Sequence, residues 1–502
     1  MVRVLTVAGL LACLASGCTS GGSSVGKEAA ADEIKKGGFT VAASCHDPQI
    51  IREGDTYYMF GSHMVGAKCQ DLRKWNYFAN GVDAANTLFD NLLTEPYAAF
   101  DFVGKNTDNG YSVWASNVIY NVTMKKYVMY FCTTSSYVKS TLCFATADNI
   151  EGPYTYVDTI LYSGYGKSNI SETNLYDVLG KNADISRYLE YGGYNNKEWP
   201  NCIDPAIFTD ADGRMWMNYG SWSGGIFLLE IDPATGYPIY PVDDKDADPY
   251  YGYRLIGGGH HSAEGPYIQY DAENGYYYLF VSYGDLQSDG GYQIRQFRSE
   301  KPTGPYVDVA GNTLEDQDDH FNYGLKMMGN YTFPSLNYTY MAPGGQSTFQ
   351  DDDGKYYITY HQRFDDGTEY HEPRVHQMYT NEDGWFVAAP FATMGETLSE
   401  KGYKKSDVSG TFYVVNHGTD ISSKIREAEA YTFADGKVTG GEKSGTYEVK
   451  EGTDYITITL DGVVYKGVLM EMTDEAENPV FCFSAAGDNE ETLWGVQYIK
   501  KE

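Results

Sequence analysis

Three carboxylates in this chain stand where they could carry out acid–base chemistry together. Asp47, Asp204 and Glu264 each open a short strand-like segment, about ten to twelve residues ahead of an aromatic strand. Burying several acids side by side is costly, and their mutual repulsion raises at least one pKa. A neutral acid beside an ionised carboxylate is what cleavage of a glycosidic bond requires. The three residues therefore predict a glycoside-cleaving site.

The same three acids are also compatible with two simpler roles. Acids at the start of a strand often do no more than satisfy a turn, and a single Asp-Pro pair would be assigned this role. Clustered carboxylates also bind hard cations such as Ca²⁺. Three acids at matching points of a repeat favour a shared site over three unrelated turns.

The elements that must position the acids recur along the chain. Each repeat contains a polar turn followed by an aromatic strand, and the five strands span residues 56–60, 126–130, 214–218, 276–280 and 355–359. Asp-Gly pairs such as Asp212-Gly213 suit hairpin turns. Repeats of about 60 to 90 residues with several short strands each indicate an all-β fold, a five-bladed β-propeller over residues 40–398.

The propeller arrangement would bring the acids together. The innermost strand of each blade lines the central axis, so residues at the same point of every repeat fall on one ring. The five ring residues are Asp47, Asn117, Asp204, Glu264 and Gln346. We expect them to converge on an axial cavity.

Several sequence motifs are similar to those of a known family. They are Cys45–Pro48, Asn201–Pro205, Gly220–Gly225, Ala263–Ile268, Ala342–Gln346 and His371–Met378. The chain resembles glycoside hydrolase family 43 from about residue 40 to its end, and most closely the two-domain bacterial endo-α-1,5-L-arabinanases. The resemblance implies hydrolysis of α-1,5-L-arabinofuranosidic bonds in arabinan with inversion of configuration.

The resemblance also implies roles for the three acids. Asp47 would be the general base that activates water, and Glu264 would be the general acid. Asp204 would raise the pKa of Glu264 and hold it in position.

Further residues match positions that line sugar sites in the family. The expected substrate-binding residues are Trp114, Asn117, Asn201, Ser221, Trp222, Ser223 and Gln346. Asn117 stands where family members often have Asp, which removes one charge from the ring.

His361 is the candidate metal ligand. A lone histidine on a strand is usually packed and hydrogen-bonded, and Ca²⁺ prefers oxygen ligands. The resemblance nevertheless implies one axial Ca²⁺ ion held through His361, with waters completing its shell. The charge of such an ion would tune the pKa values of the three acids.

Composition limits the partners of this chain. The 502 residues include 69 acidic and 37 basic side chains, a net charge of −32, so nucleic-acid phosphates would be repelled. Arabinan, found in pectin side chains, is a neutral polysaccharide, so the negative charge of the protein neither attracts nor repels it. The 47 tyrosines provide rings that can stack on sugar faces. We expect the protein to be a monomer.

The first residues predict export. An apolar run over residues 4–14 follows Arg3 and reads as a secretory signal over residues 1–17. Small residues just before Cys18 resemble the lipobox of bacterial lipoproteins, which implies lipid attachment to Cys18. A cleaved ordinary signal peptide is the alternative. Residues 18–39 then read as a flexible tether, and the lipid would be the only membrane contact, at the outer membrane or cell surface.

Two regions lie outside the repeats. Residues 161–200 form an insertion that is either a surface loop or a lip over the substrate cleft. From residue 399 to 502, seven strand-like segments with turns such as Asp461-Gly462 predict a small antiparallel β-barrel.

Other functions fit parts of this pattern. The same fold could carry an exo-acting α-L-arabinofuranosidase or a β-xylosidase. A non-catalytic glycan-binding lipoprotein and a calcium-binding propeller unrelated to sugars are alternatives of another class. The intact acid trio favours an enzyme.

Overall fold

The computed structural model describes residues 25–315, 320–441 and 443–501. The predicted signal segment, residues 1–17, and the predicted lipidation site Cys18 lie outside the described residues. Among the described residues, no helix has both the length and the apolar character needed to span a membrane.

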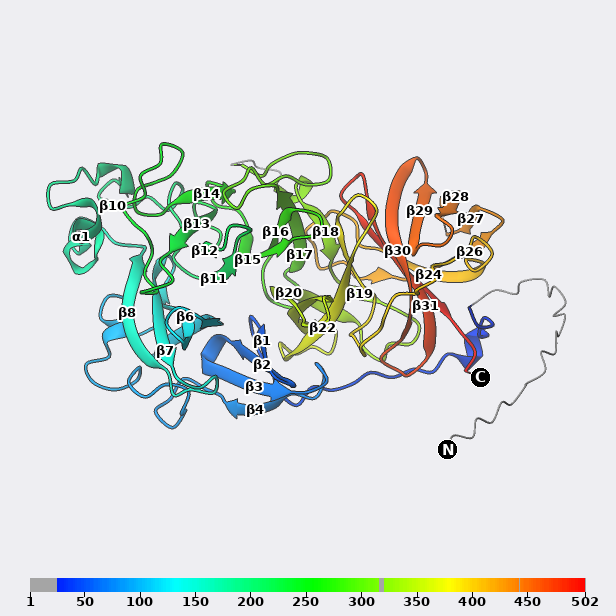
Figure 1. The fold of residues 1–502 in the computed structure, drawn as a ribbon, viewed down its shortest axis with the longest axis horizontal. Coiled ribbons are helices and arrows are strands. Elements are labelled where there is room, and N and C mark those ends of the chain that lie inside the picture. The colour runs from blue at the N-terminus through cyan, green and yellow to red at the C-terminus, as the bar shows by residue number, and fades with distance from the viewer. Residues whose placement is uncertain (1–24, 316–319, 442, 502) are drawn as a thin grey trace, which may run out of the picture.

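The chain forms five blades and a barrel, as the sequence predicts (Figure 1). Blades 1 to 4 are four-stranded antiparallel sheets, each built from one continuous segment. Their strands are β1 Gln49–Glu53, β2 Thr56–Gly61, β3 Val65–Cys69 and β4 Asn76–Ala79; β5 Ser112–Asn121, β6 Lys126–Ser136, β7 Lys139–Ala147 and β8 Thr155–Tyr162; β11 Ala206–Thr209, β12 Met215–Tyr219, β13 Ile226–Ile231 and β14 Tyr253–Ile256; and β15 Ala263–Asp271, β16 Tyr276–Tyr283, β17 Gln293–Ser299 and β18 Leu325–Met328.

Blade 5 also contains a four-stranded antiparallel sheet, and two further short strands extend it to six strands. Its sheet order is β23-β22-β21-β20-β19-β25. The strands are β19 Tyr331–Thr332, β20 Tyr340–Gln350, β21 Tyr356–Phe364, β22 His371–Thr380, β23 Phe386–Ala388 and β25 Arg426–Glu427. Because β25 comes from the C-terminal region, it joins the second domain to the propeller.

The recurring aromatic strand is the second strand of each blade. In blade 4, Tyr277, Tyr278, Leu279 and Phe280 are all buried, so both faces of the strand contact apolar neighbours. Blades pack face to face, which explains why these strands are rich in large apolar side chains instead of alternating with polar ones.

The C-terminal barrel is closed and has eight strands. They are β24 Gly410–Asn416, β26 Glu429–Ala434, β27 Lys437–Gly440, β28 Lys443–Val449, β29 Tyr455–Leu460, β30 Val463–Thr473, β31 Pro479–Gly487 and β32 Thr492–Tyr498. Seven of them match the strand-like segments of the sequence. The eighth, β27, is only four residues long and has one buried side chain, Val438, so it gives little hydrophobic pattern.

The barrel shares a hydrophobic core with the last blades. Trp494 and Met470 of the barrel belong to the same buried cluster as Tyr331 and Phe386 of blade 5. The two domains are therefore packed together and not only linked by chain.

Residues 25–39 differ from the flexible tether expected over residues 18–39. Ala29 donates its backbone N–H to Tyr498 at 2.8 Å, and Lys500 donates to Lys27 at 2.7 Å. The segment thus pairs with the end of β32, then runs along the molecule to blade 1 (Figure 1). Pairing with the chain at the end of β32 holds in place a polar sequence that has little core-forming capacity of its own.

The insertion between blades 2 and 3 contains the one α-helix among the described residues, α1 Leu175–Leu179. A two-stranded ribbon follows, β9 Leu189–Glu190 with β10 Gly193–Tyr194. Buried rings such as Tyr188 and Trp199 anchor the segment against blade 3.

Candidate active site

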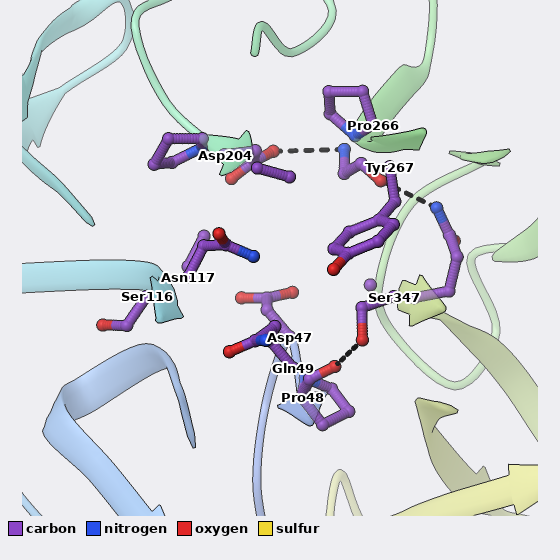
Figure 2. A pocket seen from close by; sticks show the side chains of 15 residues that line it. Asp47, Pro48, Gln49, Ser116, Asn117, Asp204, Pro266, Tyr267 and Ser347 are labelled. Atoms are coloured by element: carbon purple, nitrogen blue, oxygen red, sulfur yellow. Dashed lines mark hydrogen bonds between the residues drawn. The ribbon is translucent and has the colours of Figure 1, made fainter. Parts of the chain in front are cut away.

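An axial cavity of about 40 Å³ lies where the five inner strands meet (Figure 2). Every blade contributes three consecutive residues to its wall. They are Asp47–Gln49, Ala115–Asn117, Asp204–Ala206, Gly265–Tyr267 and Gly345–Ser347. A cavity of this size holds a few waters or one ion, not a sugar ring.

The first residue of each triplet has a left-handed backbone conformation. The φ values are +54° at Asp47, +49° at Ala115, +57° at Asp204, +55° at Gly265 and +58° at Gly345. Such values are uncommon for residues other than glycine and mark a bend in the inner strand of blades 2, 4 and 5 and just before it in blades 1 and 3.

These bends show that three members of the ring predicted from the sequence do not occupy equivalent positions. Asn117, Glu264 and Gln346 are offset by one or two residues from the structurally equivalent positions, Ala115, Gly265 and Gly345. In blades 2, 4 and 5 the pairing of the inner strand shifts at this point. The side chains still gather near the axis, but not by strict repeat equivalence.

Asp47 is held as a carboxylate. Its Oδ2 accepts hydrogen bonds from Ser62 Oγ at 2.5 Å and His46 Nδ1 at 2.8 Å. Burial alone would raise the pKa of Asp47, but His46 and the Ser62 hydroxyl outweigh it and lower the pKa. An ionised Asp47 fits the role of a general base.

Glu264 has the opposite shift. Burial raises its pKa, and the negative charge of Asp47 adds to the rise. Three donors hold the carboxyl in place: Tyr292 OH at 2.6 Å on Oε1, and Trp222 Nε1 at 2.7 Å and Ser221 Oγ at 3.1 Å on Oε2. A positioned carboxyl that keeps its proton suits a general acid.

Asp204 is the least compensated of the three acids. Burial raises its pKa well above the usual range, and the charges of Asp47 and Glu264 raise it further. One weak donor opposes this rise, the backbone N–H of Gly265 at 3.2 Å from Oδ2. The three acids are thus within electrostatic reach of one another, as predicted, and share fewer than three negative charges.

Asn117 and Gln346 connect neighbouring blades. Gln346 Oε1 accepts from Ser282 Oγ at 2.7 Å, and its Nε2 donates to the Gly265 carbonyl at 2.7 Å. Asn117 Oδ1 accepts from the Ile207 backbone at 3.2 Å. Their predicted contacts with substrate stay predictions, since these amides already have protein partners.

Trp114 and Asn201 line a larger cleft beside the axis, of about 380 Å³. The buried Oδ1 of Asn201 has no hydrogen-bond partner among the described residues. An unpaired buried acceptor is costly unless a ligand or water satisfies it. This cleft has the size and the polar groups for sugar units.

Ser223 forms a hydrogen bond with a residue that lines this cleft. Tyr137, which also lines the cleft, places its hydroxyl 2.7 Å from Ser223 Oγ and 2.8 Å from His260 Nδ1. Asn196 of the insertion donates to the same hydroxyl at 3.3 Å. The insertion therefore reaches the cleft rim, which favours the lip over the plain surface loop.

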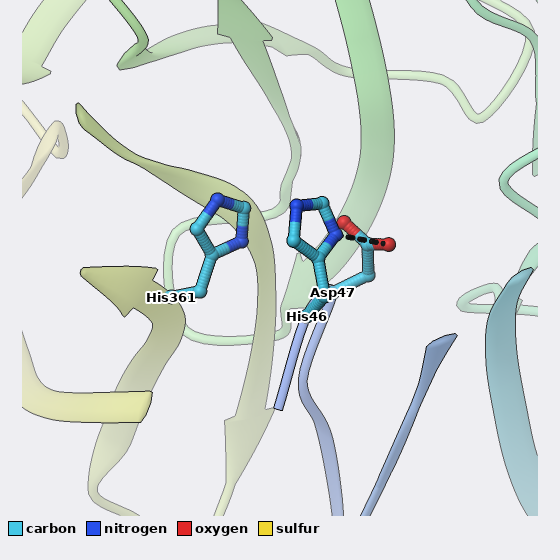
Figure 3. A group of neighbouring side chains, drawn as sticks. All are labelled: His46, Asp47 and His361. Atoms are coloured by element: carbon cyan, nitrogen blue, oxygen red, sulfur yellow. Dashed lines mark hydrogen bonds and ion pairs between the residues drawn. The ribbon is translucent and has the colours of Figure 1, made fainter. Parts of the chain in front are cut away.

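His361 is fully buried, and within the part of the chain that the structure describes neither ring nitrogen has a hydrogen-bond partner. Burial lowers its pKa well below the usual range, so the ring is neutral and able to ligate. Its ring stacks on His46 at 4.1 Å, and one ligand atom each from His46, Asp47 and His361 lies within 4.8 Å of the others (Figure 3). Any side chain at Gly345 would collide with Asp47 Oδ1 and crowd His361 Nδ1.

Some contributors give no signal in the sequence. Tyr292, the shortest contact of Glu264, lies just before β17, outside the repeated pattern. Ser62 and Tyr137 are a turn serine and a hairpin-tip tyrosine, types too common in loops to single out. His46 stands within a recognisable string, but its contact with Asp47 cannot be read from that string.

Comparison with known proteins shows which family this chain belongs to. The chain is 38% identical over 467 residues to an extracellular endo-α-(1→5)-L-arabinanase of Bacillus subtilis, covering 90% of this chain and 92% of that protein. It is 37% identical over 473 residues to the corresponding enzyme of Thermotoga petrophila, covering 91% and 94%. The chain belongs to glycosyl hydrolases family 43.

The family model itself matches residues 178–386, and a model described as a C-terminal lipocalin-like domain matches residues 390–495. A family 43 glycoside hydrolase of Bacillus licheniformis has a similar structure, with a TM-score of 0.80 at 36% identity over 92% of this chain and 99% of that one. The endo-1,5-α-L-arabinanase of Thermotoga petrophila gives 0.78 at 35% identity over 93% and 100%. The similarity to these solved structures thus extends over both domains.

Proposed function

We propose that this family 43 enzyme is an inverting endo-α-1,5-L-arabinanase. The observation that carries the proposal is the axial trio, in which Asp47 is held ionised while the pKa of Glu264 is raised. The arabinanases of Bacillus subtilis and Thermotoga petrophila, similar over about nine-tenths of this chain, support arabinan as the substrate.

The chemistry follows from the two protonation states. Glu264 donates its proton to the leaving glycosidic oxygen, while Asp47 accepts a proton from a water that attacks the anomeric carbon from the opposite face. Asp204 is electrostatically coupled to both, because the charges of Asp47 and Glu264 raise its pKa, so the three groups are not all ionised together. One displacement by water inverts the anomeric configuration.

Product analysis tests the proposal. Purified protein is incubated with linear arabinan and, separately, with an aryl arabinofuranoside, and products are resolved over time. We expect a ladder of arabino-oligosaccharides from the first time points. Arabinose as the only early product would support exo action instead, and intact arabinan would reject the assignment.

We also propose one bound Ca²⁺ ion near the axis, with His361 as a ligand. The fit is supported by the two unpaired ring nitrogens of His361, its neutral state and the neighbouring carboxylate of Asp47. Waters would supply the oxygen ligands that Ca²⁺ prefers. The ion's positive charge would favour the ionised state of nearby acids.

Thermal unfolding tests this ion independently of activity. Chelation should lower the melting temperature of wild-type protein, and added Ca²⁺ should restore it. His361→Ala should abolish the response. A wild-type melting temperature that ignores both treatments would reject the ion.

The protein is exported, in keeping with the extracellular relatives, and we propose a lipid anchor at Cys18 and a monomeric state. Mass spectrometry of the N-terminal peptide from membrane fractions would show the acyl chains. Cys18→Ala should move the protein to the soluble fraction. Light scattering of the soluble protein should give about one chain mass.

A further inference from the structure

A second groove lies away from the catalytic cleft, where blade 5, the N-terminal segment and the barrel meet. It encloses about 200 Å³, and its lining includes Phe39, Tyr338, Phe364, Tyr370, Glu372 and Arg374. Gly37 at its edge pairs with Leu336 of blade 5 and contacts Ala476 of the barrel. Packing from three parts of the molecule gives the groove a fixed shape.

The groove walls are aromatic and open to solvent. Tyr338 is 56% exposed and Tyr370 is 46% exposed, whereas only six of the 47 tyrosines, all within the described residues, are exposed. Single exposed rings are common on protein surfaces, but exposed rings that gather at one groove mark a contact site. Flat rings of this kind stack on the apolar faces of sugars, and their hydroxyls bond to sugar hydroxyls.

The floor of the groove is polar and rigid. Arg374 and Glu372, both buried, form an ion pair at 2.9 Å. Arg374 also donates to the Phe39 carbonyl at 3.2 Å and lies over the Phe39 ring at 4.4 Å. Its buried Nε has no hydrogen-bond partner in residues 25–315, 320–441 and 443–501. The Arg374–Glu372 pair carries no net charge, the exposed Asp366 adds one carboxylate to the lining, and a donor remains at Arg374 Nε. Donors and acceptors of this kind suit a hydroxyl-rich ligand.

The groove is connected to the catalytic axis by two short pieces of chain. Tyr370 directly precedes His371, whose ring lies 5.3 Å from that of His46 and 5.6 Å from that of His361. The segment at the groove, residues 37–40, ends seven residues before Asp47, which limits the gap to about 25 Å. Tyr77, another exposed ring, donates to the Ser44 carbonyl on this segment at 2.7 Å.

We propose that this groove binds a stretch of the same polysaccharide chain that is being cut, outside the catalytic cleft. The proposal rests on the proposed function, since it takes arabinan as the ligand. A volume of about 200 Å³ is below the 300–1,000 Å³ of ordinary ligand pockets. It therefore suits a single sugar unit of a chain that continues across the surface.

A double variant, Tyr338→Ala with Tyr370→Ala, tests the groove, and Tyr120→Ala is the matched control. Tyr120 is 48% exposed and lies at the opposite mouth of the propeller channel. Binding is measured by retardation in gels containing linear arabinan, in a Glu264→Gln background that slows cleavage. Hydrolysis is measured in the active background on linear arabinan and on arabinotriose.

We expect the double variant to lose most of its retardation and to raise the KM for arabinan about tenfold, while arabinotriose cleavage changes less than about twofold, because a short substrate reaches only the cleft. Tyr120→Ala should match the parent in every assay. Thermal melts check that the double variant is folded.

The outcomes separate the two proposals. If the active protein cleaves arabinan but the double variant keeps parental retardation and KM, the groove proposal fails alone. Equal losses on arabinan and arabinotriose would also overturn it, since they would show damage to the cleft. If the active parent leaves arabinan intact, the proposed function fails, whatever the gels show. Retention of an unrelated neutral glycan such as dextran, equally sensitive to the two tyrosines, would reject arabinan as the ligand.

Discussion

The five blades present polar side chains to one axis, but blades 1, 3 and 4 differ from blades 2 and 5. In blade 5 both ends of the Gln346 amide bond to the neighbouring blade. In blade 3 Asp204 has one weak backbone donor and two acidic neighbours. Of two polar side chains near the same axis, one is thus fully hydrogen-bonded and the other is electrostatically strained.

The comparison assigns different roles to the blades: the amides of blades 2 and 5 stabilise the structure, and the acids of blades 1, 3 and 4 carry the chemistry. Amides that hold adjacent blades together keep the axis closed without adding charge. The acids are held close together by that frame, although repulsion would drive them apart. Such strain persists where the surrounding structure over-determines the site, which is a mark of function.

The largest effect should come from replacing Glu264, the acid that the comparison of the blades identifies as the proton donor. Glu264→Gln keeps the shape and can still bond to Tyr292 and Trp222, but it has no proton of suitable acidity. We expect turnover on arabinan to fall by about 10³-fold, within the usual 10²–10⁴-fold contribution of a general acid. Asp47→Asn should be similarly impaired.

The matched control is Glu448→Gln, the same change at an exposed barrel position. It should leave turnover unchanged, and all variants should melt cooperatively. If Glu264→Gln kept wild-type turnover, blade 4 would not supply the general acid. Blades 1, 3 and 4 would then no longer differ in role from blades 2 and 5.

The sequence predicted the blades and the gathering of the acids because both depend on patterns that repeat. The aromatic strands at residues 56–60 and 276–280 are visible as strings, and each lies in a second strand, β2 or β16. Hydrophobic burial on both faces requires such strings wherever blades pack together.

The offset of the ring could not be predicted, since a backbone bend leaves no clear trace in residue types. Asp47 and Gly265 are compatible with a left-handed conformation, but Ala115 gives no hint of one. Tyr292 is hidden for a related reason: tertiary packing brings it to Glu264 from outside the repeat.

Asp204→Asn should reduce activity and yet stabilise the fold. The folded state resists ionising Asp204, whereas the unfolded chain releases that proton above about pH 4. The folded state therefore binds more protons between that pH and its own raised pKa, and stability falls as pH rises through this window. Asn removes the penalty, so its melting temperature should exceed that of wild type at pH 7, with the difference shrinking toward pH 4.

Turnover of Asp204→Asn should fall by about 10²-fold, the lower end for an acid–base group. Thermal melts across pH, in chelator, make the comparison. A variant that melts below wild type at every pH would show that Asp204 is compensated like Gln346.

Gln346→Ala should show the reverse balance. It leaves the Gly265 carbonyl without its donor and Ser282 without its acceptor, which costs about 1–3 kcal/mol of unfolding free energy. Turnover should fall less than about tenfold, far below the loss in Glu264→Gln. Urea denaturation gives the stability.

Gln350→Ala is the matched control for Gln346→Ala, because Gln350 is at the exposed end of the same strand, β20. It should change stability by less than about 0.5 kcal/mol. A catalytic loss in Gln346→Ala as large as that of Glu264→Gln, with normal stability, would place blade 5 among the reactive blades.

The smallest effect should come from Tyr292→Phe, which alters Glu264 without removing it. The Tyr292 hydroxyl donates to Glu264 Oε1 at 2.6 Å and lowers the pKa of that carboxyl by stabilising its ionised form. Its loss should raise the pKa, so the alkaline limb of kcat/KM against pH moves to higher pH, because Glu264 must be protonated to act. The acid limb, set by protonation of Asp47, should stay in place. Tyr120→Phe, a change at the exposed ring of the opposite mouth, should leave both limbs unmoved. An unchanged alkaline limb in Tyr292→Phe would show that a group other than Glu264 supplies the proton, and the contrast between the blades would then have to be drawn around that group.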